Sequence, residues 1–232
     1  MAVDFSKVKA ICFDVDGTLC DTDNLWVRKF VNSLTPVKGI VGEIRLQKWG
    51  RSLVMMMETP GNLIYEMLDR LHLDDDVARL YNWMAMKNIG RKPKSFWIIP
   101  NVKEMLVQLY NQYPLAVVSA RDEAGTHTFM EQYELYSYFR TIVTSQTCIY
   151  TKPFPDPIQW AAEKMGVAAE NCLMVGDTTV DIRAGKAAGA QTVGVLCGFG
   201  TERELRRAGA DLIIASTHEL LDLLLNIEKS QA

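Results

Sequence analysis

The sequence predicts an α/β fold, a Rossmann-like parallel sheet with helices on both faces and an additional α-helical cap domain inserted into it. Two observations predict it: short apolar runs alternate with amphipathic stretches, and one long interval between the first two runs has helical spacing instead. Strands that are apolar on both faces are typical of a parallel sheet that helices cover on both sides. The predicted strands are 8–14, 115–120, 141–145, 172–177, 191–196 and 210–215.

Helical stretches lie between most of these strands. The clearest are "NVKEMLVQLYNQY" (101–113), "PDPIQWAAEKMG" (155–166) and "TTVDIRAGKAAG" (178–189), in which apolar residues recur at helical spacing. In a sheet of this kind, ligands bind at the carboxyl ends of the strands. We therefore expect functional residues at the end of each predicted strand.

The interval between the first and second strands predicts a separate domain. Residues 22–92 show helical apolar spacing, and an unstructured loop of that length would be improbable. We expect a helical cap domain over 21–95, inserted into a catalytic core made of 1–20 and 96–232. Its two connections would be "DGTLCDT" (16–22) and "GRKPKSFWIIPN" (90–101).

Composition excludes several classes of protein. The 232 residues are 48% hydrophobic and 23% charged, with a net charge of -3, which gives no support for nucleic acid or an anionic membrane as a partner. The five cysteines are scattered and form no CxxC pair, which indicates free thiols rather than disulfides or a zinc site. Neither a signal sequence nor a membrane-spanning stretch is predicted, so we expect a cytoplasmic protein.

Four predicted strands carry polar residues at or shortly after their ends. These residues are Asp14 and Asp16 after the first strand, Ser119 after the second, Lys152 after the third, and Asp177 and Asp181 after the fourth. Each has an ordinary structural explanation when taken alone, such as a turn, a solvated lysine or a residue that favours the start of a helix. Their coincidence at one edge of a sheet predicts a shared site.

These residues carry a resemblance to a known family. "DVDGT" (14–18), Ser119, Lys152 and "GDTTVD" (176–181) match, in order and spacing, the four motifs of haloacid dehalogenase (HAD) superfamily hydrolases. The insertion resembles the small helical cap of the phosphoglycolate phosphatase-like branch, as does the segment 184–211. A true dehalogenase is disfavoured because its pattern lacks the second acid, which is present here as Asp16.

The resemblance implies a phosphatase that works through an aspartyl-phosphate intermediate. Asp14 would be the nucleophile, Asp16 the general acid and base, and Ser119 and Lys152 the groups that hold the phosphoryl oxygens. A Mg²⁺ ion would be held by the side chain of Asp14, the backbone carbonyl of Asp16 and the side chain of Asp177. The resemblance also implies that Asp181 binds the metal or orients a water on it.

Charge counting gives a separate reason to expect a cation. A phosphate dianion at this site would meet three carboxylates, and one like-charge pair at about 4 Å costs roughly 4 kcal/mol at an effective dielectric near 20. Mg²⁺ prefers oxygen ligands and supplies two positive charges, and Lys152 supplies a third.

The substrate is expected to be a small phosphorylated metabolite, with phosphoglycolate as the leading guess by resemblance. Arg51, in "WGRSLVMMM" (49–57), is a candidate second anion clamp, and Lys87, Arg91 and Arg121 are weaker ones. A phosphomutase of the β-phosphoglucomutase type is an alternative function. A non-catalytic phosphoacceptor of the receiver type is another, which the length, the insertion and the acids after the fourth strand disfavour. The sequence does not decide between a monomer and a homodimer.

Overall fold

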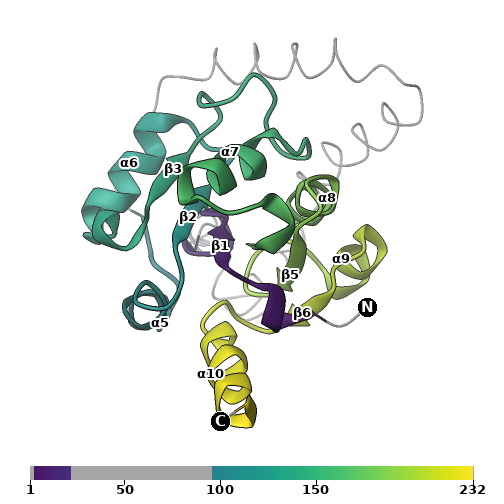
Figure 1. The fold of residues 1–232 in the computed structure, drawn as a ribbon. Helices are drawn as coiled ribbons and strands as arrows, with labels where there is room; N and C mark the ends of the chain where they lie inside the picture. Colours follow the sequence, from purple (N-terminus) through teal and green to yellow (C-terminus); the bar gives the residue numbers. More distant parts are fainter. Residues whose placement is uncertain (1–2, 22–95, 232) are drawn as a thin grey trace, which may run out of the picture. The chain divides into compact units, whose positions relative to one another are not determined.

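The computed structural model describes residues 3–21 and 96–231, which belong to one compact unit built from Met1–Asp21 and Lys92–Ala232. Its centre is a six-stranded parallel sheet of order β3-β2-β1-β4-β5-β6 (Figure 1). All six predicted strands are confirmed. They are β1 (Ala10–Phe13), β2 (Leu115–Val118), β3 (Thr141–Val143), β4 (Cys172–Gly176), β5 (Gln191–Val195) and β6 (Leu212–Ile214).

The strand order places the site at the middle of the sheet. From β1 the chain builds outward through β2 and β3, and then returns to build outward on the other side through β4, β5 and β6. The order therefore reverses between β1 and β4, and this reversal is the place where open parallel sheets bind ligands. Phe13 pairs with Val175 of β4 and with Val117 of β2, so these three strands end nearly level.

Helices cover both faces of the sheet, as predicted. The α-helices are α5 (Val102–Leu109), α6 (Glu123–Gln132), α7 (Asp156–Met165), α8 (Thr179–Ala187), α9 (Glu202–Ala208) and α10 (Glu219–Gln231). Short 3₁₀ turns lie at Phe5–Lys7, Tyr136–Tyr138 and Ala169–Asn171. The three helices named from the sequence correspond to α5, α7 and α8.

Two apolar clusters show which helices cover which face. Residues of α5, α6 and α10 pack with Ile11 and Phe13 of β1, whereas residues of α7 and α8 pack with Ala10 and Cys12 of the same strand. This alternation follows from the strand period of two residues. Because β1 and β4 are buried on both faces, their continuous apolar runs are explained.

The two predicted connections lie side by side where the structure describes them. The Asp21 amide donates to the Trp97 carbonyl at 2.7 Å, the Ile99 amide donates to the Leu19 carbonyl at 3.0 Å, and Cys20 pairs with Ile98 in an antiparallel bridge. The predicted helical domain itself lies outside the described residues. Its boundaries at 21 and 95 therefore remain predictions.

The structure also bears on the expected absence of a membrane-spanning segment and on the state of the cysteines. Among the helices that the structure describes, none combines the length and the apolar character that crossing a membrane requires. All five cysteines are free thiols, as their spacing predicts.

Candidate active site

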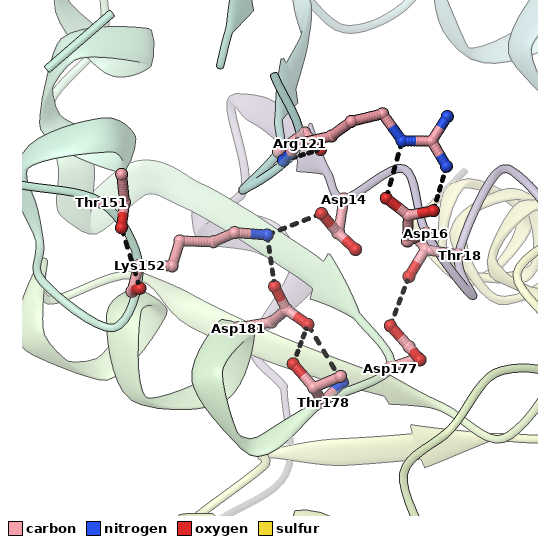
Figure 2. A network of polar contacts seen from close by, with 10 residues as sticks. Asp14, Asp16, Thr18, Arg121, Thr151, Lys152, Asp177, Thr178 and Asp181 are labelled. Atoms are coloured by element: carbon pink, nitrogen blue, oxygen red, sulfur yellow. Dashed lines mark hydrogen bonds and ion pairs between the residues drawn. The ribbon is translucent and has the colours of Figure 1, made fainter. Parts of the chain in front are cut away.

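The fold brings the six predicted polar residues to the carboxyl edge of the sheet, and Figure 2 shows five of them close together. Asp14 directly follows β1, Ser119 follows β2, and Asp177 follows β4. Lys152 comes from the segment between β3 and α7, and Asp181 lies in the first turn of α8. All but Asp16 are buried, with exposed fractions of 6% or less.

Lys152 links two of the acids. Its Nζ donates to Oδ1 of Asp14 at 2.6 Å and to Oδ1 of Asp181 at 2.5 Å, and only 3% of the lysine side chain is exposed. Burial by itself lowers the pKa of an ammonium group, but the two carboxylates outweigh it and raise the pKa of Lys152 above its ordinary value. Lys152 is therefore a buried cation inside the site and not a solvated turn residue.

Asp181 is fixed from both sides. Its Oδ2 accepts hydrogen bonds from the Thr178 amide at 3.0 Å and from the Thr178 hydroxyl at 2.7 Å, which forms a capping box at the start of α8. Its Oδ1 accepts from Lys152. One oxygen of Asp181 therefore caps the start of α8, as considered from the sequence, and the other faces the site.

The Asp177 side chain is closely surrounded by the backbone at Gly17, Gly198 and Phe199. Its Oδ2 accepts from the Phe199 amide at 2.8 Å, and its Oδ1 lies 3.4 Å from the Thr18 hydroxyl. A Cβ added at Gly17 or at Gly198 would approach that same Oδ2 within 2.2 and 2.1 Å respectively, so no larger residue fits at either position. Gly17 also has a φ of 73°, which favours glycine.

Three carboxylates form a candidate metal site. Asp14, Asp177 and Asp181 each offer an oxygen atom, and these oxygens all lie within 4.8 Å of one another. With Lys152 as the one cation hydrogen-bonded to them among the described residues, three carboxylates and one ammonium leave two negative charges in a buried place. Hard oxygen donors with an excess of two negative charges fit a divalent cation such as Mg²⁺.

The carboxyl group of Asp14, the candidate nucleophile, has a raised pKa in the metal-free protein. Burial raises the pKa of Asp14 to about 7; the charges of Asp181 and Asp16 act in the same direction, and Lys152 opposes them. About half of the Asp14 carboxyl groups would therefore carry a proton near neutral pH. A cation at the three-carboxylate cluster would favour the ionised form.

Asp16 has a different partner from the other acids. Its side chain is 31% exposed, and both of its oxygens accept hydrogen bonds from Arg121: Nε donates to Oδ2 at 2.9 Å and Nη2 donates to Oδ1. The Arg121 amide donates to the Ser119 hydroxyl oxygen at 3.1 Å. Sequence analysis names Arg121 only as a weak candidate for an anion clamp; in the structure it pairs with Asp16.

Some site residues were not predicted, and some predictions are not tested. Thr18, Thr178, Gly198 and Phe199 contact the acids, and their only sequence signals are the "DGT", "GDTTVD" and "GFG" stretches that contain them. Arg51 lies outside the described residues, as do Lys87 and Arg91. Their part in binding substrate stays a prediction.

Comparisons with known proteins agree with this geometry. A phosphoglycolate phosphatase from Shigella dysenteriae is 28% identical over 95% of this chain and 94% of its own. The pyrophosphatase PpaX of Oceanobacillus iheyensis is 27% identical over 94% of this chain and 97% of its own. The solved structure of a haloacid dehalogenase-like family hydrolase from Streptococcus pneumoniae superimposes with a TM-score of 0.61 at 20% identity, covering 94% of this chain and 99% of that one.

The family model for haloacid dehalogenase-like hydrolases matches residues 11–195, a range that contains all four motifs, strands β2 to β5 and all but the first residue of β1. The sheet is parallel, as expected for this fold, and the residues of the four motifs lie at or near its carboxyl edge. The chain therefore belongs to the haloacid dehalogenase-like hydrolase family.

Proposed function

We propose that this protein is a Mg²⁺-dependent phosphatase that hydrolyses a small phosphorylated metabolite through an aspartyl-phosphate intermediate. The observation that carries the proposal is the buried cluster of Asp14, Asp177 and Asp181 with Lys152 hydrogen-bonded to the first and last of them. The family membership and the names of its relatives, which are phosphatases, support it.

Asp14 and Asp16 divide the chemistry between them. A carboxylate oxygen of Asp14 forms a bond to phosphorus as the bond to the leaving oxygen breaks, and Asp16 gives that oxygen its proton. Asp16 then takes a proton from water, the water oxygen bonds to phosphorus, and the bond to Asp14 breaks to release inorganic phosphate. The partial exposure of the Asp16 side chain suits a group that must meet both a leaving group and water.

The remaining residues bind charge and hold geometry. Lys152 keeps Asp14 and Asp181 in place and, together with Ser119, contributes donors for phosphoryl oxygens. Asp14 and Asp177, with the backbone carbonyl of Asp16, would hold Mg²⁺, and Asp181 would bind or orient a water on it. When bound, the ion supplies positive charge that offsets the carboxylates and the incoming phosphate.

The leaving group is the least determined part of the proposal. One relative is named for phosphoglycolate and another for pyrophosphate, and both compounds are small and anionic. We keep phosphoglycolate as the leading substrate. A screen of some dozens of phosphorylated metabolites with Mg²⁺, which reads free phosphate, tests this choice and would also detect pyrophosphate hydrolysis.

A phosphomutase remains a second candidate, although no contact among the described residues favours it. It would have to return an isomerised sugar phosphate instead of free phosphate. The receiver alternative loses its support, because the chain belongs to a family of hydrolases. Repeated release of phosphate, as opposed to a single phosphorylation, is the discriminating measurement.

The first prediction concerns the nucleophile. Asp14→Asn should leave the fold intact and lower turnover by at least about 10³-fold, since an amide cannot displace the leaving oxygen from phosphorus. Phosphate release is measured on a preparation shown by mass spectrometry to be free of deamidated protein. Substantial residual turnover there would remove Asp14 from this role.

The second prediction separates acid–base help from binding. Asp16→Asn should lower kcat/KM for an alkyl phosphate by about 10²–10⁴-fold. The loss should be much smaller for p-nitrophenyl phosphate, whose leaving group needs little protonation. Because kcat/KM includes the phosphorylation step, it reports this difference directly. An equal loss on both substrates would mean that Asp16 has a structural role.

The third prediction concerns the metal requirement. Excess chelator should abolish turnover, Mg²⁺ should restore it, and Ca²⁺ should restore it poorly, because the larger ion accepts more oxygen ligands and favours a looser geometry. Phosphate release after dialysis and re-addition of each ion measures this. Full turnover in chelator would show that the three-carboxylate cluster is not a metal site.

The fourth prediction uses stability instead of activity. In unfolded chains an Asp has a pKa near 3.9, so the folded, metal-free protein holds a proton on Asp14 that the unfolded chain has lost between about pH 4 and 7. Stability from this group is therefore lost as the pH rises through that window. In chelator, Asp14→Asn should melt at nearly the wild-type temperature at pH 4, where this loss has only begun.

At pH 8 the same variant should melt roughly 10 °C higher than the wild type, since a rise of the pKa from near 3.9 to about 7 corresponds to about 4 kcal/mol, and 1 kcal/mol shifts the melting temperature by about 2–4 °C in a chain of this size. Mg²⁺ should then stabilise the wild type more at pH 8 than at pH 4, and the variant little at either pH. A melting difference between variant and wild type that does not change with pH would contradict the raised pKa of Asp14.

A further inference from the structure

Arg121 and Asp16 form an ion pair that is separate from the cluster of buried acids. Arg121 belongs to none of the four family motifs. Both oxygens of Asp16 are held by one guanidinium through a forked pair of hydrogen bonds. The arginine side chain is only 13% exposed. An exposed ion pair contributes little, but a forked and largely buried one fixes the direction of a carboxylate.

The guanidinium is itself held on its flat face. The Arg121 Cζ lies 4.4 Å from the centre of the Phe96 ring, which is a cation–π contact. The backbone of Arg121 is anchored as well: its amide donates to the Ser119 hydroxyl, and its carbonyl accepts from the Ser145 amide at 3.1 Å. Arg121 is therefore constrained at both ends.

Phe96 is a rigid support for this contact. Its amide donates to the Gln132 side chain at 2.9 Å, and its carbonyl accepts from Gln132 at 2.7 Å and from the Tyr133 hydroxyl at 2.8 Å. Its ring packs edge-on against Phe129 of α6, with centroids 5.9 Å apart. A continuous series of contacts thus runs from α6 through Phe96 and Arg121 to Asp16.

We infer that Arg121 is a positioning residue for Asp16, supported by Phe96, and that it fixes the direction in which Asp16 meets the leaving group. The inference rests on the proposed function, in which Asp16 exchanges protons with the leaving oxygen and with water. When a catalytic carboxyl group is displaced by about 1 Å, the reaction rate can fall on the order of 10²-fold.

The test compares leaving groups. In Arg121→Met, kcat/KM for an alkyl phosphate should fall about 10–100-fold, while kcat/KM for p-nitrophenyl phosphate should fall less than about 3-fold. Arg121→Lys should recover only part of the loss, because an ammonium cannot make the forked pair. Phe96→Leu should show a weaker form of the same selective loss with the charges unchanged.

A matched control is available on α9. Arg206 also donates to a carboxylate through Nε and Nη2, but its Glu202 pair is on the surface, with 69% of the arginine side chain exposed. Arg206→Met should leave both kcat/KM values unchanged. Melting curves of all variants show whether a loss arises from unfolding, and a folded Arg121→Lys or Phe96→Leu keeps the test decisive if Arg121→Met is unstable.

A double-mutant cycle with Asp16→Asn completes the test. If Arg121 acts through Asp16, Arg121→Met should add little to the alkyl-phosphate loss already caused by Asp16→Asn. Equal losses on alkyl and aryl phosphates, a gain in activity, or full additivity in the cycle would each overturn the inference while leaving the phosphatase proposal intact. A wild-type protein that hydrolyses no phosphorylated compound would instead overturn the proposed function, and this inference with it.

Discussion

The site depends on one constraint, which is that three carboxylates lie together in a buried place at the centre of the sheet. Carboxylates brought out of water repel one another and lose hydration, so they need positive charge and hydrogen-bond donors nearby. Lys152 meets this need for Asp14 and Asp181, and backbone amides meet it for Asp177 and Asp181. With all three acids ionised, the described residues leave two negative charges uncompensated, and these are the physical basis for a divalent cation.

The backbone keeps these charges from moving apart. Asp14 and Asp177 directly follow β1 and β4, neighbouring strands buried on both faces, and the pairing of Phe13 with Val175 fixes how far each extends. The glycines at 17 and 198 let the surrounding chain approach Asp177 more closely than any side chain would allow. The sheet and its loops therefore hold the acids together against their mutual repulsion, which Lys152 relieves in part and a bound cation would relieve further.

Much of this arrangement follows from the sequence, because it depends on strand ends. A run such as "CLMVGD" shows both that a strand is buried and which residue ends it, and parallel strands place those ends at one edge. Three helices were not named from the sequence; α6, for example, is short of apolar residues, in "EAGTHTFMEQ". The contact of Phe199 with Asp177 was not predictable either, because it joins residues 22 positions apart that only the folded chain brings together.

The pairing of Arg121 with Asp16 was also not predictable from the sequence. An arginine two residues after a strand can turn toward solvent, toward a substrate or toward a neighbouring acid, and the sequence does not distinguish these directions. The choice is made by the Phe96 ring, which comes from a segment that pairs with residues 19–21 after β1. The direction of one side chain thus depends on a contact between two distant parts of the chain.

The acids of the site are consequently held in two different ways, and the difference matches what each has to do. Asp14, Asp177 and Asp181 are buried, and the sheet, backbone amides and a buried lysine hold them, which suits the fixed geometry that the proposed cation would require. Asp16 is partly exposed, which suits the proposed mechanism, in which it meets first a leaving group and then water. A side-chain partner such as Arg121 can direct a carboxylate without burying it, whereas the inner acids are held by a buried lysine and by backbone amides.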